Sequence, residues 1–257
     1  MDLLMTELLA TIQWGGTWQA VNFFDSAIIS FLNGFAHRSY TIDTFMYLLD
    51  FNPLMKAIPI LAVVWWAWFK DGESSTNNRE FLLFGIMGSA VAVAVARTLS
   101  LMVPFRERPM RNSTLHFILP YNVKAEHLLG WNSFPSDNAA LFFSVATSVI
   151  FISWRAGVFA VLYSCLTVGV ARIYLGIHYP TDVLAGALIG IGVVSLSRVT
   201  TVRETITSPA LQWLNRAPGP FYACFFIITY VIAETFSSLI EAGGYFYATM
   251  RAIIRWL

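Results

Sequence analysis

Six uncharged apolar stretches constrain what this chain can fold into. They occupy Ala57–Phe69, Phe81–Ala96, Asn138–Trp154, Ala156–Ala171, Val183–Ser197 and Ala217–Ala233. Each is slightly shorter than the about 20 residues of a spanning helix and reaches that length with its flanking residues. Hydrophobic residues make up 57% of the 257 residues and charged residues only 12%, against about 25% charged in an average soluble domain. The sequence predicts an all-α fold, a polytopic membrane helical bundle with about six transmembrane helices.

The region before the first apolar stretch has a different pattern. Between Trp18 and His37, apolar residues alternate with polar ones such as Asn22 and Asp25. This segment is more amphipathic than a spanning helix, so we expect it at the membrane interface, with a poorly hydrophobic seventh span as the alternative. The expected organisation is an N-terminal interfacial segment (1–52), a membrane core (53–199), and a C-terminal loop with an extra membrane helix (200–257).

Alternation of the spans assigns the loops to two faces. Lys70–Glu80, Arg155 and Arg198–Arg216 share one face, and the long loop Phe105–Phe134 shares the other with the turn Gly176–Thr181. The first face carries more basic residues, which favours the cytoplasmic side. The net charge of +1 provides no basic excess for a nucleic-acid backbone, so we expect no such partner.

Three polar stretches, Arg97–Pro109, Ser133–Ala139 and Ala171–Asp182, are predicted to meet at the second face. They bring arginines, which bind anions through planar paired donors, and they contain no metal-ligand cluster. Ser136 is suited to cap the helix that follows it, and Pro180 to the first turn of another. Free backbone amides at both helix starts are expected to face an anion.

His178 and Asp182 are spaced i, i+4. If this turn is helical, the carboxylate lies beside the imidazole, where it would fix the tautomer and stabilise the imidazolium. The spacing therefore predicts that His178 and Asp182 form a pair within this cluster.

The three stretches resemble the signature of the membrane type-2 phosphatidic acid phosphatase family, whose site is shared with vanadium haloperoxidases and bacterial acid phosphatases. The family pattern is Lys-x6-Arg-Pro, then Pro-Ser-Gly-His, then Ser-Arg-x5-His-x3-Asp. The matching residues are Arg108, Pro109, Pro135, Ser136, Arg172, His178 and Asp182. The departures are Leu101 for Lys, Asp137 for Gly, Asn138 for His and Ala171 for Ser. The order of motifs and spans fits the family from about Asn52 to Val199.

The resemblance implies an integral-membrane phosphatase acting on a lipid-linked phosphate or diphosphate, without metal or other cofactor. His178 would attack phosphorus to give a phosphohistidine, while Asp182 holds its other nitrogen. Arg108, Arg172 and Ser136 would bind the phosphoryl oxygens together with backbone amides. We expect a bacterial inner membrane, with the site on the periplasmic or outer side. The oligomeric state is left open.

The first departure removes a cation. Leu101 cannot bind phosphate, but Arg97 lies one helical turn earlier and Arg106 two residues before Arg108. Both are therefore candidate phosphate ligands. An arginine within a lipid-embedded helix is costly, which favours a function for Arg97, and a structural contact with a carboxylate or a carbonyl is the alternative.

The departure at position 138 removes a proton donor. In the family, a His at this position protonates the leaving group, and the amide of Asn138 cannot do so. Losing a general acid typically lowers the rate by about 10²–10⁴, but less when the leaving group is a weak base. This favours a diphosphate, such as a polyprenyl diphosphate, over a phosphomonoester. Alternatively Asp137, His116 or His127 donates the proton. Two further alternatives are a lipid phosphotransferase with the same intermediate and a non-catalytic binder of lipid phosphate.

Overall fold

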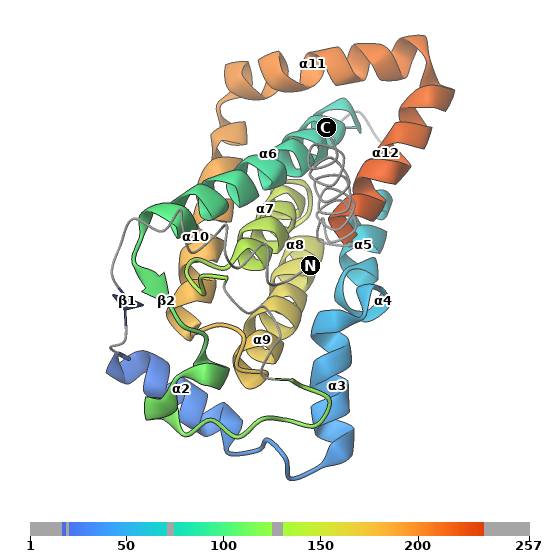
Figure 1. The fold of residues 1–257 in the computed structure, drawn as a ribbon. Coiled ribbons are helices and arrows are strands. Elements are labelled where there is room, and N and C mark those ends of the chain that lie inside the picture. Colours follow the sequence, from blue (N-terminus) through green and yellow to red (C-terminus); the bar gives the residue numbers. More distant parts are fainter. Residues whose placement is uncertain (1–16, 19–20, 71–74, 125–130, 234–257) are drawn as a thin grey trace, which may run out of the picture.

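The computed structural model describes residues 17–18, 21–70, 75–124 and 131–233. This part of the chain is almost entirely helical (Figure 1). Its α-helices are α2 (Phe23–Asn33), α3 (Tyr40–Phe51), α4 (Pro53–Lys56), α5 (Ile58–Trp68), α6 (Ser75–Met102), α7 (Asp137–Ile152), α8 (Trp154–Ser164), α9 (Ala171–Tyr174), α10 (Pro180–Ser195), α11 (Thr200–Arg216) and α12 (Pro218–Ala233). The expected all-α fold is confirmed.

Short elements complete the described chain. β1 (Thr17–Trp18) pairs in parallel with β2 (Phe105–Arg106). Three 3-10 turns span Pro109–Arg111, Ser113–Leu115 and Leu196–Arg198, and a π-helical stretch, Cys165–Val170, joins α8 to α9. A π-helical stretch within an α-helix is often found beside a functional site, and this one ends two residues before Arg172.

The helix α7 forms the centre of the bundle, between α6, α8 and α10 (Figure 1). Every residue from Asn138 to Val149 is buried. Its 16 residues give a length of about 24 Å at 1.5 Å per residue, less than the about 30 Å of a bilayer core. Because protein surrounds it on all sides, α7 holds the residues at its start in a fixed position.

Two glycines of α10 allow it to approach α7 closely. A Cβ atom on Gly186 would lie 2.1 Å from the carbonyl oxygen of Ser136, and one on Gly190 would lie 2.2 Å from that of Ala140. Both distances are far inside van der Waals contact, so only glycine fits. This small-residue contact sets the start of α7 against the start of α10.

Three helical segments in the described part of the chain are long and apolar enough to cross a membrane: Ser75–Met102, Trp154–Tyr174 and Pro180–Arg198. The apolar helices α5, α7 and α12 are shorter, although the sequence predicts spans at all three places. The fold is therefore that of an integral membrane protein, with three clear candidate spans where the sequence predicts about six.

The N-terminal helices have an inverted polarity. In α2, Asp25 and Asn33 are buried whereas Phe23 and Phe31 are exposed by 87% and 67%. Apolar side chains outside and polar ones inside are typical of a surface covered by lipid. At 11 residues, α2 is far shorter than a spanning helix, and it packs against α9 and α10. Its location at the interface stays a prediction.

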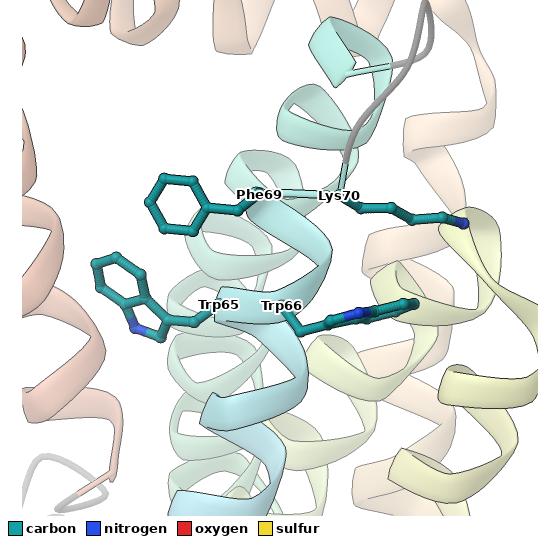
Figure 2. Close-up of a pocket in the computed structure, with 4 residues that line it drawn as sticks. All are labelled: Trp65, Trp66, Phe69 and Lys70. Atoms are coloured by element: carbon teal, nitrogen blue, oxygen red, sulfur yellow. The ribbon is translucent and has the colours of Figure 1, made fainter.

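A shallow hollow of about 600 Å³ lies at the end of α5, lined by Trp65, Trp66, Phe69 and Lys70. Figure 2 shows Trp65 and Phe69 on one side of the helix and Trp66 and Lys70 on the other. Aromatic residues with a lysine are typical of a membrane–water interface. The helix α11 crosses this same end of the bundle (Figure 1), opposite the motif residues.

The contact between α10 and α7 can be tested with two glycines of one helix. We expect Gly186→Ala to destabilise the protein by about 1–3 kcal/mol, because the added methyl displaces the Ser136 backbone. Nothing lies within 4 Å of a Cβ on Gly192, so Gly192→Ala should leave stability unchanged or raise it slightly. Thermal unfolding in detergent measures both variants, and equal midpoints would contradict the packing argument.

Candidate functional site

The three motif stretches meet at Ser133. Its backbone amide donates to the carbonyl oxygen of Arg106 at 3.0 Å, and its hydroxyl donates to Asp182 Oδ2 at 2.6 Å. Its own carbonyl oxygen lies 2.8 Å from Nδ1 of His178. The structure thus brings residues from positions 106, 133, 178 and 182 into one buried cluster, at the end of the bundle where the sequence predicts convergence.

The contacts of His178 determine which of its nitrogens carries the proton. A carbonyl oxygen can only accept a hydrogen bond, so Nδ1 carries the proton and donates it to Ser133. The other nitrogen, Nε2, is then unprotonated and lies 3.4 Å from Arg172 Nη1. His178 is 3% exposed. Its Nε2 lone pair therefore accepts a long hydrogen bond from the Arg172 guanidinium, within a site closed to water.

Asp182 lies beside His178 but is not its main hydrogen-bond partner. Asp182 Oδ2 is 3.6 Å from Nδ1, longer than the contact of Nδ1 with the Ser133 carbonyl. The same oxygen accepts hydrogen bonds from the Ser133 hydroxyl and the Tyr179 amide. Asp182 therefore acts on His178 mostly by holding Ser133 in place and by its nearby charge. The i, i+4 spacing brings the two side chains together, but His178 precedes the first turn of α10.

Arg106 is held between two carboxylates. Its Nη2 lies 2.6 Å from Asp25 and its Nη1 lies 2.5 Å from Asp182, with 2% of its side chain exposed. The guanidinium also lies 3.7 Å from the centre of the Tyr179 ring. These contacts connect α2, β2 and α10. The positive charge of Arg106 is therefore paired with Asp25 and Asp182.

The expectation of free amides at the start of α10 is wrong. The Thr181 amide donates to Asp25 Oδ1 at 2.9 Å, and the Thr181 hydroxyl donates to Asp25 Oδ2 at 2.7 Å. Helix starts favour a negative charge, and here a carboxylate from α2 supplies it. At the start of α7, Ser136 caps Ala139 as expected, and the Asp137 side chain accepts from the next amide.

Arg108 and Arg172 retain donors that the rest of the site leaves unused. Arg108 Nη1 donates to the carbonyl of Ile177 at 2.7 Å, but its Nε is buried without a hydrogen-bond partner among the described residues. Arg172 Nε lies 3.0 Å from Asp50 Oδ1, and its geometry is not that of a hydrogen bond. Both arginines are over nine-tenths buried. Buried N–H groups of this kind are suited to bind an anion.

Asn138 is held between Asp137 and a lysine from the start of the bundle. Its amide nitrogen donates to Asp137 Oδ1 at 3.1 Å, and its amide oxygen accepts from Lys56 Nζ at 2.7 Å. Asp137 also forms an ion pair with Arg97, whose guanidinium lies 4.5 Å from the Trp131 ring centre. In these contacts Asp137 acts as a hydrogen-bond acceptor. Arg97 forms a structural contact with a carboxylate, the alternative to phosphate binding that the sequence left open.

The other expected residues lie as follows. Leu101 is exposed on α6, and His116 is exposed at the end of a 3-10 turn. His127 falls outside the described residues. No group of three or more His, Cys, Asp or Glu residues with the arrangement of a metal site occurs in the described parts of the chain.

Asp25, Asp50 and Lys56 are central to this cluster but were not expected from the sequence, and Ser133, which begins the second stretch, was given no role there. Asp50 Oδ1 lies 3.2 Å from Lys56 Nζ, and its side chain is fully buried. The available signal was a charged residue within or beside a largely apolar segment, the same argument that singled out Arg97. The amphipathic pattern of the first 50 residues masked that signal, because it places polar residues on a solvent-facing side by default.

The titration of His178 follows from its surroundings. Burial lowers its pKa, and the charges of Arg108 and Arg172 lower it further, whereas Asp182 opposes the shift. The resulting pKa is about 4, so the imidazole is neutral at pH 7. Burial and the charge of Arg172 also lower the pKa of Arg108, to about 9, and Arg108 remains a cation.

The ion pairs of Arg106 predict a large loss of stability on their removal. Arg106→Met would leave the carboxylates of Asp25 and Asp182 buried without their guanidinium, at a loss of about 3–5 kcal/mol. Arg155 is exposed, so Arg155→Met should change stability by less than about 0.5 kcal/mol. Thermal unfolding in detergent compares them, and a small effect of Arg106→Met would contradict the assigned ion pairs.

The lowered pKa of His178 predicts a pH-dependent stability. Below about pH 6.5 the unfolded chain binds a proton at His178, but the folded chain does so only near its pKa of about 4. As pH falls through this range, wild type should lose on the order of 3 kcal/mol relative to His178→Gln. Unfolding midpoints of both proteins from pH 7 to 4 measure the difference. Parallel curves would contradict the shift.

The chain was compared with protein families and known proteins. Residues 81–206 match the PAP2 superfamily. Undecaprenyl-diphosphatase BcrC of Bacillus subtilis is 28% identical over 165 residues, covering 64% of this chain and 77% of that protein. The bacitracin transport permease protein BcrC of Bacillus licheniformis is 28% identical, with coverages of 63% and 72%. The putative undecaprenyl-diphosphatase YbjG of Escherichia coli is 31% identical over 139 residues, with coverages of 53% and 63%.

Among solved structures, Aquifex aeolicus LpxE aligns with a TM-score of 0.49 and 25% identity, over 70% of this chain and 98% of that one. The matched family segment contains all three motif stretches, the helices α7 to α10 and all but the first six residues of α6. The core of this chain, residues 81–206, is therefore a domain of the PAP2 superfamily, the lipid phosphatase family that its motifs resemble.

Proposed function

We propose that this protein is a membrane phosphatase that hydrolyses a lipid-linked diphosphate, with a polyprenyl diphosphate as the favoured substrate and His178 as nucleophile. The observation that carries the proposal is the state of His178. Its Nδ1 proton is held by the Ser133 carbonyl, so Nε2 is unprotonated and its lone pair faces Arg172 Nη1 at 3.4 Å. The names of two relatives, an undecaprenyl-diphosphatase and a putative undecaprenyl-diphosphatase, support the lipid class.

The reaction proceeds in two transfers at one phosphorus atom. His178 Nε2 forms a bond to the terminal phosphorus while the bridging P–O bond breaks, and its electron pair leaves with the lipid monophosphate. A water oxygen then bonds to phosphorus, a water proton is lost to the surroundings, and the P–N electron pair returns to Nε2. Arg108 and Arg172 stabilise the charge on the phosphoryl oxygens in both steps.

The remaining side chains position the nucleophile. Ser133 holds the tautomer, and Asp182 holds the Ser133 hydroxyl. Arg106 fixes Asp182 from its other side, so we assign it a positioning role in place of phosphate binding. Asp182 also stabilises the positive charge that His178 gains during attack.

Asn138 supports a diphosphate as the substrate. An amide cannot donate a proton to an alkoxide leaving group, and Asp137 is engaged by Arg97 and Asn138. A lipid monophosphate leaves as a weak base and needs no such donor, whereas the alcohol of a phosphomonoester does. The site is therefore suited to break a P–O–P bond.

The arrangement of the helices supports a location for the site. The site lies at the end of the bundle opposite α11 and the Lys70 end of α5 (Figure 1). Basic residues are more numerous at that other end, which favours the cytoplasm there and the periplasmic or outer side for the site. We infer a bacterial inner membrane, as expected for a carrier of the polyprenyl type.

Phosphate release from detergent-solubilised lipids tests the function. We expect release from a polyprenyl diphosphate to exceed release from phosphatidic acid, and His178→Ala to lower it by at least about 10³-fold. A phosphohistidine should be trapped by rapid acid-free denaturation with labelled substrate. His116→Ala should keep full activity, because His116 is exposed. Equal and negligible release by wild type and His178→Ala would leave a non-catalytic lipid-phosphate binder as the function.

A further inference from the structure

Lys56 is a buried cation that none of the three motifs supplies. It ends α4, is 6% exposed, and precedes the matched family segment by 25 residues of sequence, since that segment begins at residue 81. Lysine is almost never fully buried unless it is paired. Its Nζ donates to Asn138 Oδ1 at 2.7 Å and lies 3.2 Å from Asp50 Oδ1. The ammonium therefore lies beside the position where Asn replaces the motif histidine.

The short helix α4 holds Lys56 in a fixed position. The Asn52 side chain caps α4 by accepting from the amides of Leu54 and Met55. The hydroxyl of Tyr163, from α8, donates to the Met55 carbonyl. Contacts on both sides thus anchor α4, so the ammonium is presented to the site from a rigid support.

The ammonium keeps donors for a further partner. Lysine has three N–H donors, and Asn138 takes one of them. The approach to Asp50 is an ion pair without hydrogen-bond geometry, because neither Asp50 oxygen has a hydrogen-bond partner among the described residues. Asn138 cannot turn its nitrogen towards Lys56, since Asp137 holds it.

Lys56 also adds to the positive charge that faces the substrate. Asp50 lies between Lys56 and Arg172, and its Oδ1 is within 3.2 Å of both. No carboxylate in the described part of the chain pairs with Arg108. Lys56, Arg108 and Arg172 exceed Asp50 by two positive charges, and the Arg106 group, with one cation between Asp25 and Asp182, offsets one of them. Arg108 and Arg172 are suited to bind the phosphoryl group that is transferred. The second phosphate of a diphosphate carries its own negative charge and requires a further cation.

We propose that the Lys56 ammonium binds the leaving phosphate of a lipid diphosphate, next to Asn138. This inference rests on the proposed function and names the residue that recognises the second phosphate. As His178 attacks, the bridging P–O bond breaks and its electron pair moves onto the leaving phosphate. The ammonium stabilises this charge and keeps its proton. Lys56 thereby supplies, from a different helix, the cation that Leu101 does not provide.

The test compares substrates with one and two phosphates in the full-length protein. Lys56→Met should lower kcat/KM for a polyprenyl diphosphate by about 10²-fold, but that for p-nitrophenyl phosphate by less than about tenfold, because only the first has a leaving phosphate. Lys56→Arg should recover most of the loss, since it keeps the charge. The matched control is Lys70→Met, at the far end of α5, which should keep wild-type rates on both.

Inhibitor binding provides a second measurement that does not depend on how fast Lys56→Met turns over a substrate. Inhibition by methylenediphosphonate should weaken about tenfold in Lys56→Met, whereas inhibition by inorganic phosphate should not change. A purely structural Lys56 would weaken both equally. Equal losses for both substrates and for both inhibitors would overturn the proposal.

A background without the Asp50 charge separates recognition from charge balance. If Lys56 only neutralised Asp50, Lys56→Met would have no effect on kcat/KM in an Asp50→Asn protein, and that result would refute its role in recognition. We expect the same loss of diphosphate preference there. Failure of the function itself looks different, because wild type would then release no more phosphate than His178→Ala. An active wild type with an unaffected Lys56→Met variant would overturn only the assignment of Lys56.

Discussion

The position of Arg106 between Asp25 and Asp182 is the interaction on which the rest of the site depends. The guanidinium contacts both carboxylates and the face of the Tyr179 ring while almost fully buried. Through Asp182 it holds Ser133, and through Ser133 it determines the tautomer of His178. A buried charge is stable only with its partners in place, so docking of α2 and the reactivity of the imidazole are coupled.

Lipid surroundings explain why so few charges suffice. Where the surface faces hydrocarbon, a charged side chain is expensive unless it turns inward and pairs. Asp25, Asp43 and Asp50 do so from the two N-terminal helices, and each is at most 3% exposed. Asp43 accepts from the amides of His37 and Tyr121. The first 56 residues therefore provide carboxylates and one lysine to a site whose recognisable motifs all come later in the chain.

Much of the site could be predicted from local spacing. Arg172 precedes His178 by six residues, and His178 precedes Asp182 by four. This spacing indicates a short turn between two helices, which the structure shows. Ser136 and Pro180 start α7 and α10 as their capping preferences indicate. The Ser133 carbonyl as the partner of His178, and Asp25 as the anion at the start of α10, could not be predicted, because backbone atoms and distant carboxylates leave no periodic signal.

The sequence alone determined the membrane environment, the helical fold class and the family. Hydropathy, capping and motif spacing are local properties that can be recognised without knowing the tertiary structure. It also located the departures from the family pattern, Leu101 and Asn138 among them. Only the tertiary structure decided which charges meet. Arg97 pairs with Asp137, Arg106 joins α2 to α10, and Lys56 reaches Asn138 across 82 residues of chain. Such pairings depend on how buried helices pack, and packing sets the separation of side chains that sequence distance does not encode.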